Sequence, residues 1–274
     1  MNKTLTNKLA IGVLWFMTGC TVAILGTVLL YVFVNGLRVI SPEFIFTWPR
    51  GVNAEGGVWP TIVATIYVTA LAMLISTPIA VLAAVYLAEY AYQGKTVSAI
   101  RFAADSLASV PSIVMGLFGF ALFVEAMGMG LSMISAALAL SLLMLPIIMR
   151  ATEEAIRAVP KYMRWGSYGL GATKWQTVSR IVLPASAPRV ITGIVLAMGR
   201  AVGETAVVLY TMGQAVNMPI TPLDSGRPMT VHLYLLAIEG INLPAAFGTA
   251  LLLIVMILAF NLSARWILRR SRKV

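Results

Sequence analysis

Residues 9–34 read LAIGVLWFMTGCTVAILGTVLLYVFV and contain no charged side chain. About 20 mostly apolar residues are enough for a helix to cross the ~30 Å hydrocarbon core of a bilayer. The chain has further long segments with few or no charges, which cover residues 62–86, 107–124, 131–149, 190–212 and 247–263. Because backbone groups in lipid must form hydrogen bonds within their own segment, we expect six transmembrane helices.

The composition excludes a soluble domain. Hydrophobic residues make up 59% of the 274 residues and charged residues 11%, whereas soluble proteins average ~45–50% and ~25%. A single cysteine, Cys20, and a single histidine, His232, predict neither a disulfide nor a metal site. The chain also lacks a Gly-x4-Gly-Lys-Ser/Thr phosphate loop and a nucleophile–base set, so we expect no enzyme activity and no bound cofactor. The fold class predicted is an all-α integral membrane protein.

The distribution of basic residues predicts the orientation in the membrane. Six spans place both termini on one side. All Lys and Arg residues except Arg38, Arg50, Arg200 and Arg227 then belong to that side or its loops. Cytoplasmic segments carry such an excess, so we predict a multi-pass protein of the cell (inner) membrane with cytoplasmic termini. The net charge of +10 therefore requires no nucleic-acid partner.

The cytoplasmic segment 150–189 is polar and predicts two short helices. Pro160 suits the start of a helix over 161–170, and Gly171 can end it in a left-handed conformation. The sequence Thr173-Lys174-Trp175-Gln176 predicts a capping box for a second helix over 174–181, which we expect to end before Pro184. Such a knob could dock into a soluble partner. The alternative is an ordinary amphipathic surface loop.

The fifth apolar segment contains two charged residues. Arg200 lies about 15 Å along a helix that begins near residue 190, close to the bilayer midplane. Glu204 would follow one turn later on the same face and pair with it. Gly199 and Gly203 have the G-x-x-x-G spacing that lets another helix approach closely. Because ionised groups are costly in lipid, we expect a substrate pathway in which Arg200 meets an anion. The alternative is an ion pair that only holds two helices together.

The cytoplasmic segment resembles the coupling loop of ABC importer permeases, EAA-x3-G-x9-I-x-LP. Gly171, Ile181 and Leu183-Pro184 match its second half, whereas its Glu-Ala-Ala corresponds here to Trp165-Gly166-Ser167. The resemblance implies that this loop contacts a cytoplasmic ATPase, without the family's carboxylate. The residues assigned to it are Trp165, Gly166, Ser167, Gly171, Ala172, Thr173, Lys174, Trp175, Ile181, Leu183 and Pro184.

Four runs are together similar to the PstA-type permeases of phosphate ABC importers. They are Gly199–Ala206 (GRAVGETA), Glu153–Pro160 (EEAIRAVP), Tyr168–Gln176 (YGLGATKWQ) and the segment 224–234. The resemblance implies a type I ABC importer permease fold in a heterodimer with a PstC-like second permease subunit. It also implies two PstB-like ATPase subunits, which would use ATP and Mg, and a PstS-like extracytoplasmic phosphate-binding protein. In related permeases the arginine of this run is important for transport, which points to Arg200.

We therefore expect two regions: residues 1–60 with the first span and an external loop, and residues 61–274 as the ABC importer transmembrane domain with its coupling loop 150–189. The function predicted is ATP-driven import of inorganic phosphate. A permease for another oxyanion, such as molybdate or sulfate, stays an alternative. An ion-coupled secondary transporter and a membrane scaffold that only recruits a partner are further alternatives.

Overall fold

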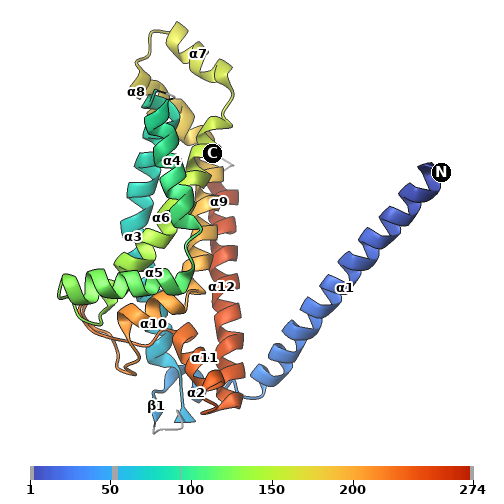
Figure 1. Ribbon diagram of the computed structural model, residues 1–274, viewed down its shortest axis with the longest axis vertical. Coiled ribbons are helices and arrows are strands. Elements are labelled where there is room, and N and C mark those ends of the chain that lie inside the picture. The colour runs from blue at the N-terminus through green and yellow to red at the C-terminus, as the bar shows by residue number, and fades with distance from the viewer. Residues whose placement is uncertain (1–2, 51–54, 93, 272–274) are drawn as a thin grey trace.

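The structure is a computed structural model that describes residues 3–50, 55–92 and 94–271, and it is built almost entirely from helices (Figure 1). The described elements, in chain order, are α1 (Lys3–Leu37), α2 (Pro42–Phe46), β1 (Pro49–Arg50), β2 (Glu55–Gly56), α3 (Trp59–Val85), the π-helical η1 (Tyr86–Tyr90), α4 (Lys95–Ala108), α5 (Ser112–Gly119), the π-helical η2 (Phe120–Ala126), α6 (Met133–Arg157), α7 (Lys161–Gly169), α8 (Lys174–Thr177), the π-helical η3 (Val178–Val182), α9 (Leu183–Val202), α10 (Ala206–Met212), α11 (Met229–Ile238) and α12 (Leu243–Ser271). The two short strands pair antiparallel, with Pro49 opposite Gly56.

Five helices of the described ranges are long and apolar enough to cross a membrane. They cover Ala10–Leu37, Trp59–Tyr90, Met133–Arg157, Lys174–Val202 and Leu243–Ser263. These helices contain or overlap five of the six predicted spans. The structure therefore confirms a helical, multi-pass membrane protein.

The span expected over 107–124 is not one continuous helix. α4 ends at Ala108 and α5 begins at Ser112, and their axes are bent by 99°. Pro111 stands at the bend with an extended backbone (ψ 138°). It has no N–H to donate, and its ring excludes the helical hydrogen bond to the preceding turn. Counted as one broken span, the pair brings the number of crossings to six.

The core of the bundle is the contact between α3 and α6. Small residues on one face of α3, among them Ala64, Ala72 and Ala80, are fully buried. They let the two backbones come close, as small residues do between membrane helices. A hydrogen bond joins the helices directly, because Ser141 Oγ of α6 donates to Ala72 O of α3 (3.0 Å).

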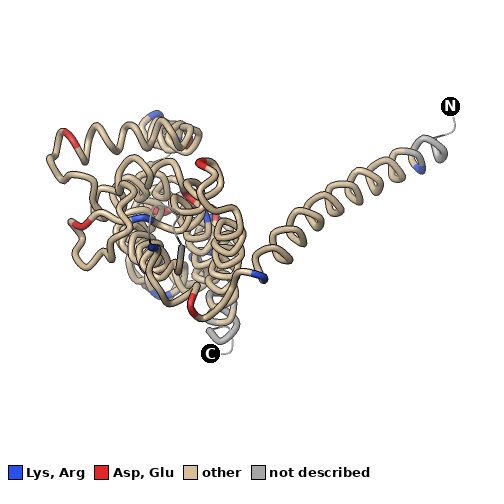
Figure 2. Tube along the Cα trace, turned by 90° about the horizontal axis from the view of Figure 1, so that it is seen from below, with Lys and Arg blue, Asp and Glu red and all other residues tan. Residues whose placement is uncertain are grey.

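α1 stands apart from this core and leans away from the bundle, as both views show (Figures 1 and 2). Its side chains over the apolar window are exposed, and it contacts α12 only near its C-terminal end. There, a Cβ at Gly36 would lie 2.8 Å from Leu251 Cβ and from Phe247 O, so only glycine fits. Tyr31 packs edge-on against Phe247.

The ends of the chain lie on the same side of the molecule. In Figure 1 the N label, at the far end of α1, and the C label, beside the bundle, both lie toward the end of the molecule that carries α7 and α8. The view from below in Figure 2 shows long helical stretches without Lys, Arg, Asp or Glu, above all in α1. This is the arrangement expected if the polar segment 150–189 and both ends of the chain lie on one side of a membrane.

Candidate functional site

The segment after α6 forms a compact knob of two helices beyond the end of the bundle (Figure 1). α6 continues to Arg157, α7 begins after Pro160, and Gly171 has φ +79°. Thr173 Oγ1 accepts from Gln176 N (3.3 Å) while Gln176 Oε1 accepts from Thr173 N (2.8 Å). The predicted helix start, glycine turn and capping box are confirmed.

The second helix of the knob does not end before Pro184, which corrects the predicted boundary. It continues through η3 into α9, so that Lys174–Val202 is one helix. Within η3, Leu183 N–H donates to Val178 O, five residues back. Pro184, the second residue of α9, follows this wider π-helical turn, and the helix continues through it without a break.

Buried contacts hold the knob to the bundle. Its base is an apolar cluster of Val85, Ile156, Val159, Val178 and Val182, which come from the ends of α3 and α6 and from η3. Between its two helices, the hydroxyls of the predicted loop residue Ser167 and of Thr177 lie 2.8 Å apart in a buried hydrogen bond. The knob is therefore a packed unit and not a flexible connection.

The outer surface of the knob is unusually apolar. Tyr162, Trp165, Leu170 and Trp175 are 70%, 67%, 91% and 62% exposed. We call these four residues the apolar patch. Large exposed aromatic and aliphatic side chains are typical of sites of protein contact. Trp165, in place of the family's glutamate, contributes to this patch.

The remaining predicted loop residues fall into two groups. Gly166, Gly171, Thr173, Lys174 and Pro184 are exposed, whereas Ala172, Ile181 and Leu183 are half-buried. Lys174 Nζ lies 5.0 Å from the centre of the Tyr90 ring at the end of η1. The loop thus combines an exposed surface with residues that attach it to the bundle.

Arg200 lies at the end of a membrane helix that breaks. α9 ends at Val202 and α10 begins at Ala206, so the predicted helix over 190–212 is two helices. The carbonyl of Glu204, freed by the break, accepts a hydrogen bond from Thr230 Oγ1 of α11 (2.9 Å). Arg200 is exposed and Glu204 is half-buried.

The predicted Arg200–Glu204 pair is wrong for this conformation. Glu204 is not on α9, so the one-turn spacing does not put it on the same face as Arg200. Among the described side chains, no ion pair or hydrogen bond links these two. The charged groups next to the break are therefore not neutralised by one another.

The G-x-x-x-G pair beside Arg200 is open on its outer side. A Cβ at Gly199 would meet only Asn261 Nδ2 of α12, at 3.8 Å, and a Cβ at Gly203 would meet only nearby carbonyls of its own segment at 3.7 Å. α12 thus lies only at ordinary van der Waals distance from Gly199, and Gly203 meets its own segment, so neither glycine makes the close helix contact that the spacing predicted.

A close contact near the break involves other glycines, which the sequence analysis did not identify. A Cβ at Gly116 of α5 would lie 2.9 Å from Ala206 O at the start of α10, and one at Gly119 would lie 2.8 Å from Ala139 Cβ of α6. α5 therefore packs closely against α10, the helix that follows the break after Val202, and against α6. The spacing of charged residues along the sequence does not predict the contact between α5 and α10.

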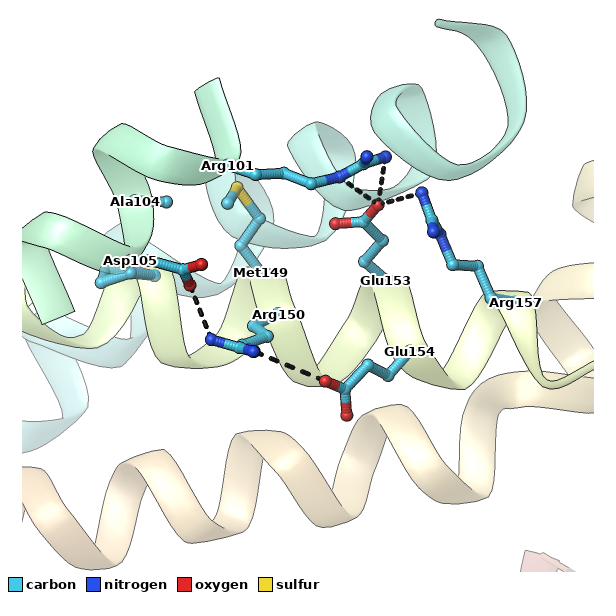
Figure 3. Close-up of a pocket in the computed structure, with 9 residues that line it drawn as sticks. Arg101, Ala104, Asp105, Met149, Arg150, Glu153, Glu154 and Arg157 are labelled. Atoms are coloured by element: carbon cyan, nitrogen blue, oxygen red, sulfur yellow. Dashed lines mark hydrogen bonds and ion pairs between the residues drawn. The ribbon is translucent and has the colours of Figure 1, made fainter. Parts of the chain in front are cut away.

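A charged cavity of about 210 Å³ lies between α4 and α6 near the knob (Figure 3). Glu153 Oε1 accepts from Arg101 (2.7 Å) and Arg157 (2.8 Å), and Arg150 pairs with Asp105 (2.7 Å) and more weakly with Glu154 (3.5 Å). Each arginine has a carboxylate partner, so the cavity ties α4 to α6 and offers no free cation to an anion. Within the described residues, no group of three or more His, Cys, Asp or Glu could hold a metal ion.

The Glu89 side chain, at the knob end of the helix formed by α3 and η1, is shielded from water. Its carboxylate pairs with Arg164 of α7 at 2.6 Å, and the two side chains are only 8% and 15% exposed. A partner 75 residues away has no local sequence signal.

Comparison with known proteins gives one matching family model. Residues 76–273 match the model described as "binding-protein-dependent transport system inner membrane component". The chain is 36% identical over 283 residues to the probable ABC transporter permease protein YqgI of Bacillus subtilis (strain 168), a match that covers 97% of this chain and 96% of that protein. It is 38% identical over 234 residues to the phosphate transport system permease protein PstA 1 of Mycobacterium tuberculosis (strain H37Rv), covering 82% and 76%.

Two solved structures share the fold. A bacterial alginate ABC transporter in complex with an alginate pentasaccharide-bound periplasmic protein superimposes with a TM-score of 0.73 at 15% identity, over 98% of this chain and 96% of that one. The inward-facing MetNI methionine ABC transporter gives a TM-score of 0.61 at 21% identity, over 78% and 94%.

Proposed function

The chain belongs to the family of binding-protein-dependent transport system inner membrane components, and from this premise we propose that it is the phosphate-translocating permease subunit of an ATP-driven importer. It is a transport permease, not an enzyme. Its fold is that of type I ABC importer permeases. The proposed cargo, inorganic phosphate, follows from the names of its PstA relatives.

The observation that carries the proposal is the exposed Arg200 at the break between α9 and α10. It is the only charged residue from 190 to 203. Broken membrane helices commonly form the substrate sites of transporters. A guanidinium fits a phosphate-like oxyanion through two parallel hydrogen bonds. Without a bond to Glu204, Arg200 is available to such an anion. We propose that Glu204 lies nearby in the pathway and that its negative charge keeps the site at Arg200 from binding the anion too tightly.

We propose that the knob formed by α7 and α8 is the coupling loop and that its apolar patch docks into the partner ATPase. Members of this family work with a separate ATPase and a periplasmic binding protein. The ATPase, in this proposal a pair of PstB-like subunits, binds ATP and Mg, and this chain binds no cofactor. Trp165 and Trp175 supply the contact area that the family's glutamate does not provide here.

A second, PstC-like permease subunit completes the proposed membrane assembly. The open faces at Gly199 and Gly203 and the unpartnered length of α1 offer surfaces for it. A PstS-like phosphate-binding protein would deliver the anion from outside. In this proposal both termini are cytoplasmic, in the cell (inner) membrane. Residues 1–60 form a separate N-terminal region ahead of the transport domain 61–274.

Uptake into reconstituted vesicles tests the proposal. The chain is assembled with its ATPase, second permease and binding protein, and uptake of radioactive phosphate is measured with and without ATP. Arg200→Gln should reduce uptake roughly ten- to hundredfold, because it removes a charge-assisted, two-bond contact. The matched control is Arg189→Gln, an exposed arginine near the other end of α9, which should transport normally.

The outcomes separate the alternatives. Normal uptake by Arg200→Gln would remove Arg200 from the pathway. Uptake of sulfate or molybdate in preference to phosphate would replace the proposed cargo. Uptake that persists without ATP would contradict an ATP-driven importer.

A further inference from the structure

Arg164 of α7 makes a buried ion pair with Glu89 of η1. Its Nε and Nη2 atoms lie 3.0 and 2.6 Å from Glu89 Oε1, and both side chains are largely shielded from water. Salt screens buried pairs far less than exposed ones. The pair therefore fixes the position of α7 relative to the end of α3 and η1.

The same guanidinium also holds the end of α6. Nη1 donates to Val159 O (2.7 Å) and Nη2 donates to Ile156 O (2.9 Å). These carbonyls belong to the last turn of α6 and the residues after it, and the Ile156 carbonyl also accepts from Val159 N (3.2 Å). Arg164 thus joins three parts of the chain: the knob, the end of α3 and the end of α6.

A second contact attaches the knob to the same place. Lys174 of α8 lies over the ring of Tyr90, the residue after Glu89. By contrast, the ion pair between Arg150 and Asp105 in the charged cavity is open to water, with side chains 65% and 53% exposed. Exposed pairs of that kind contribute little to stability, so the two pairs at this end of the bundle are expected to behave differently.

α3 is the element through which a movement could reach the opposite end of the molecule. It packs along α6, and Thr65 Oγ1 near its other end accepts a hydrogen bond from Met229 N at the start of α11 (2.8 Å). Glu89 lies at the knob end of the same continuous helix, Trp59–Tyr90.

We propose that Glu89 and Arg164 are positioning residues that make the coupling loop and the knob end of α3 move as one body. A displacement imposed on the knob then reaches α3 and the external helix α11. This inference rests on the proposed function, in which an ATPase moves the knob. It adds that the ion pair between Glu89 and Arg164 is the joint between the knob and the end of α3.

The first test measures coupling. In the reconstituted complex, phosphate uptake and ATP hydrolysis are measured together for Glu89→Gln and for the matched control Asp105→Asn, which removes the charge from the exposed pair. Glu89→Gln should lower the phosphate taken up per ATP hydrolysed by roughly fivefold or more, while the ATPase still co-purifies. Asp105→Asn should keep the wild-type ratio. A wild-type ratio for Glu89→Gln overturns the proposal.

A double variant covers the case in which the single one does not fold, because Glu89→Gln leaves a buried, unpaired guanidinium. Glu89→Met with Arg164→Met keeps the volume and removes both charges, so it should assemble. It should show the same lowered ratio. A wild-type ratio in this variant, or loss of the complex in both variants, would show a merely structural role and overturn the proposal.

A distance measurement tests the Glu89–Arg164 joint independently of whether phosphate is the cargo. Spin labels are placed at Tyr168→Cys on α7, which lies outside the apolar patch, and at Tyr86→Cys on η1, both exposed positions, after Cys20→Ser. In the otherwise unchanged complex the distance should stay the same with and without ATP. With Glu89→Gln it should change on ATP binding, and a constant distance would overturn the joint. If the complex binds ATP but imports no phosphate, the proposed cargo fails while the joint is still tested.

Discussion

Arg200 is the residue on which the proposed chemistry depends. Its position at the end of α9, exposed and without a bond to Glu204, makes the geometry of its head group decisive. Arg200→Lys keeps the positive charge but loses the planar fork that binds an oxyanion with two bonds. We expect uptake about tenfold below wild type, and above that of Arg200→Gln. The measurement is the initial rate of phosphate uptake in the same vesicles. If Arg200→Lys supports the wild-type rate, residue 200 acts through its positive charge alone and not through two parallel hydrogen bonds.

For single residues, the sequence identified Arg200 and Glu204 as candidates for the substrate pathway but did not predict which groups they contact. A charge inside an apolar run is visible in the sequence, so Arg200 and Glu204 could be identified. Their separation by the end of α9 depends on Thr230, which binds the Glu204 carbonyl from another helix. Likewise, Glu89 borders a loop in sequence and its burial depends on Arg164. Contacts between distant segments are tertiary and leave no local pattern.

Among the elements, the knob is where the structure follows the prediction from local sequence most closely. Gly171 ends α7 with φ +79°, a conformation that costs side-chain-bearing residues about 1–2 kcal/mol, and a β-branched residue more. Gly171→Val should therefore distort the turn between α7 and α8 and weaken co-purification of the ATPase about tenfold or more. Gly171→Asn, which tolerates this conformation, should largely retain it.

The control for that turn is Gly169→Val. Gly169 lies in α7, is exposed, and would meet nothing within 4 Å if it carried a Cβ. The same substitution two residues earlier should leave ATPase binding close to wild type. Equal losses at both positions would mean that bulk on the knob surface, and not the turn, explains the effect.

The helices show what a long segment without charged residues can and cannot predict. The length of such a segment predicts a membrane span, so the spans corresponding to α1, α3, α6 and α12 were placed correctly. It does not predict whether the helix bends or breaks within the segment. The bend at Pro111 and the break after Val202 both fall inside apolar segments. Pro184, by contrast, was expected to end a helix, and the π-helical turn η3 accommodates it.

For the whole molecule, the decisive property is which face of the bundle meets the ATPase. The knob and both ends of the chain lie on one face (Figure 1). The segment between α10 and α11, which includes the exposed Ile220, connects helices away from that face. Because nearly all basic residues belong to the knob face or its neighbouring segments, the positive-inside bias predicts that this face is cytoplasmic.

Labelling of single cysteines tests this orientation in intact cells. In a Cys20→Ser background, a membrane-impermeant maleimide should label Ile220→Cys and leave Tyr168→Cys, which lies on α7 outside the apolar patch, unlabelled until the membrane is permeabilised. Both positions are exposed, at 79% and 41%, so a difference between them reports the side of the membrane and not burial within this chain. The reverse pattern would place the knob outside. An ATPase that works on cytoplasmic ATP could then not reach it, and the coupling proposal would fail at its first step.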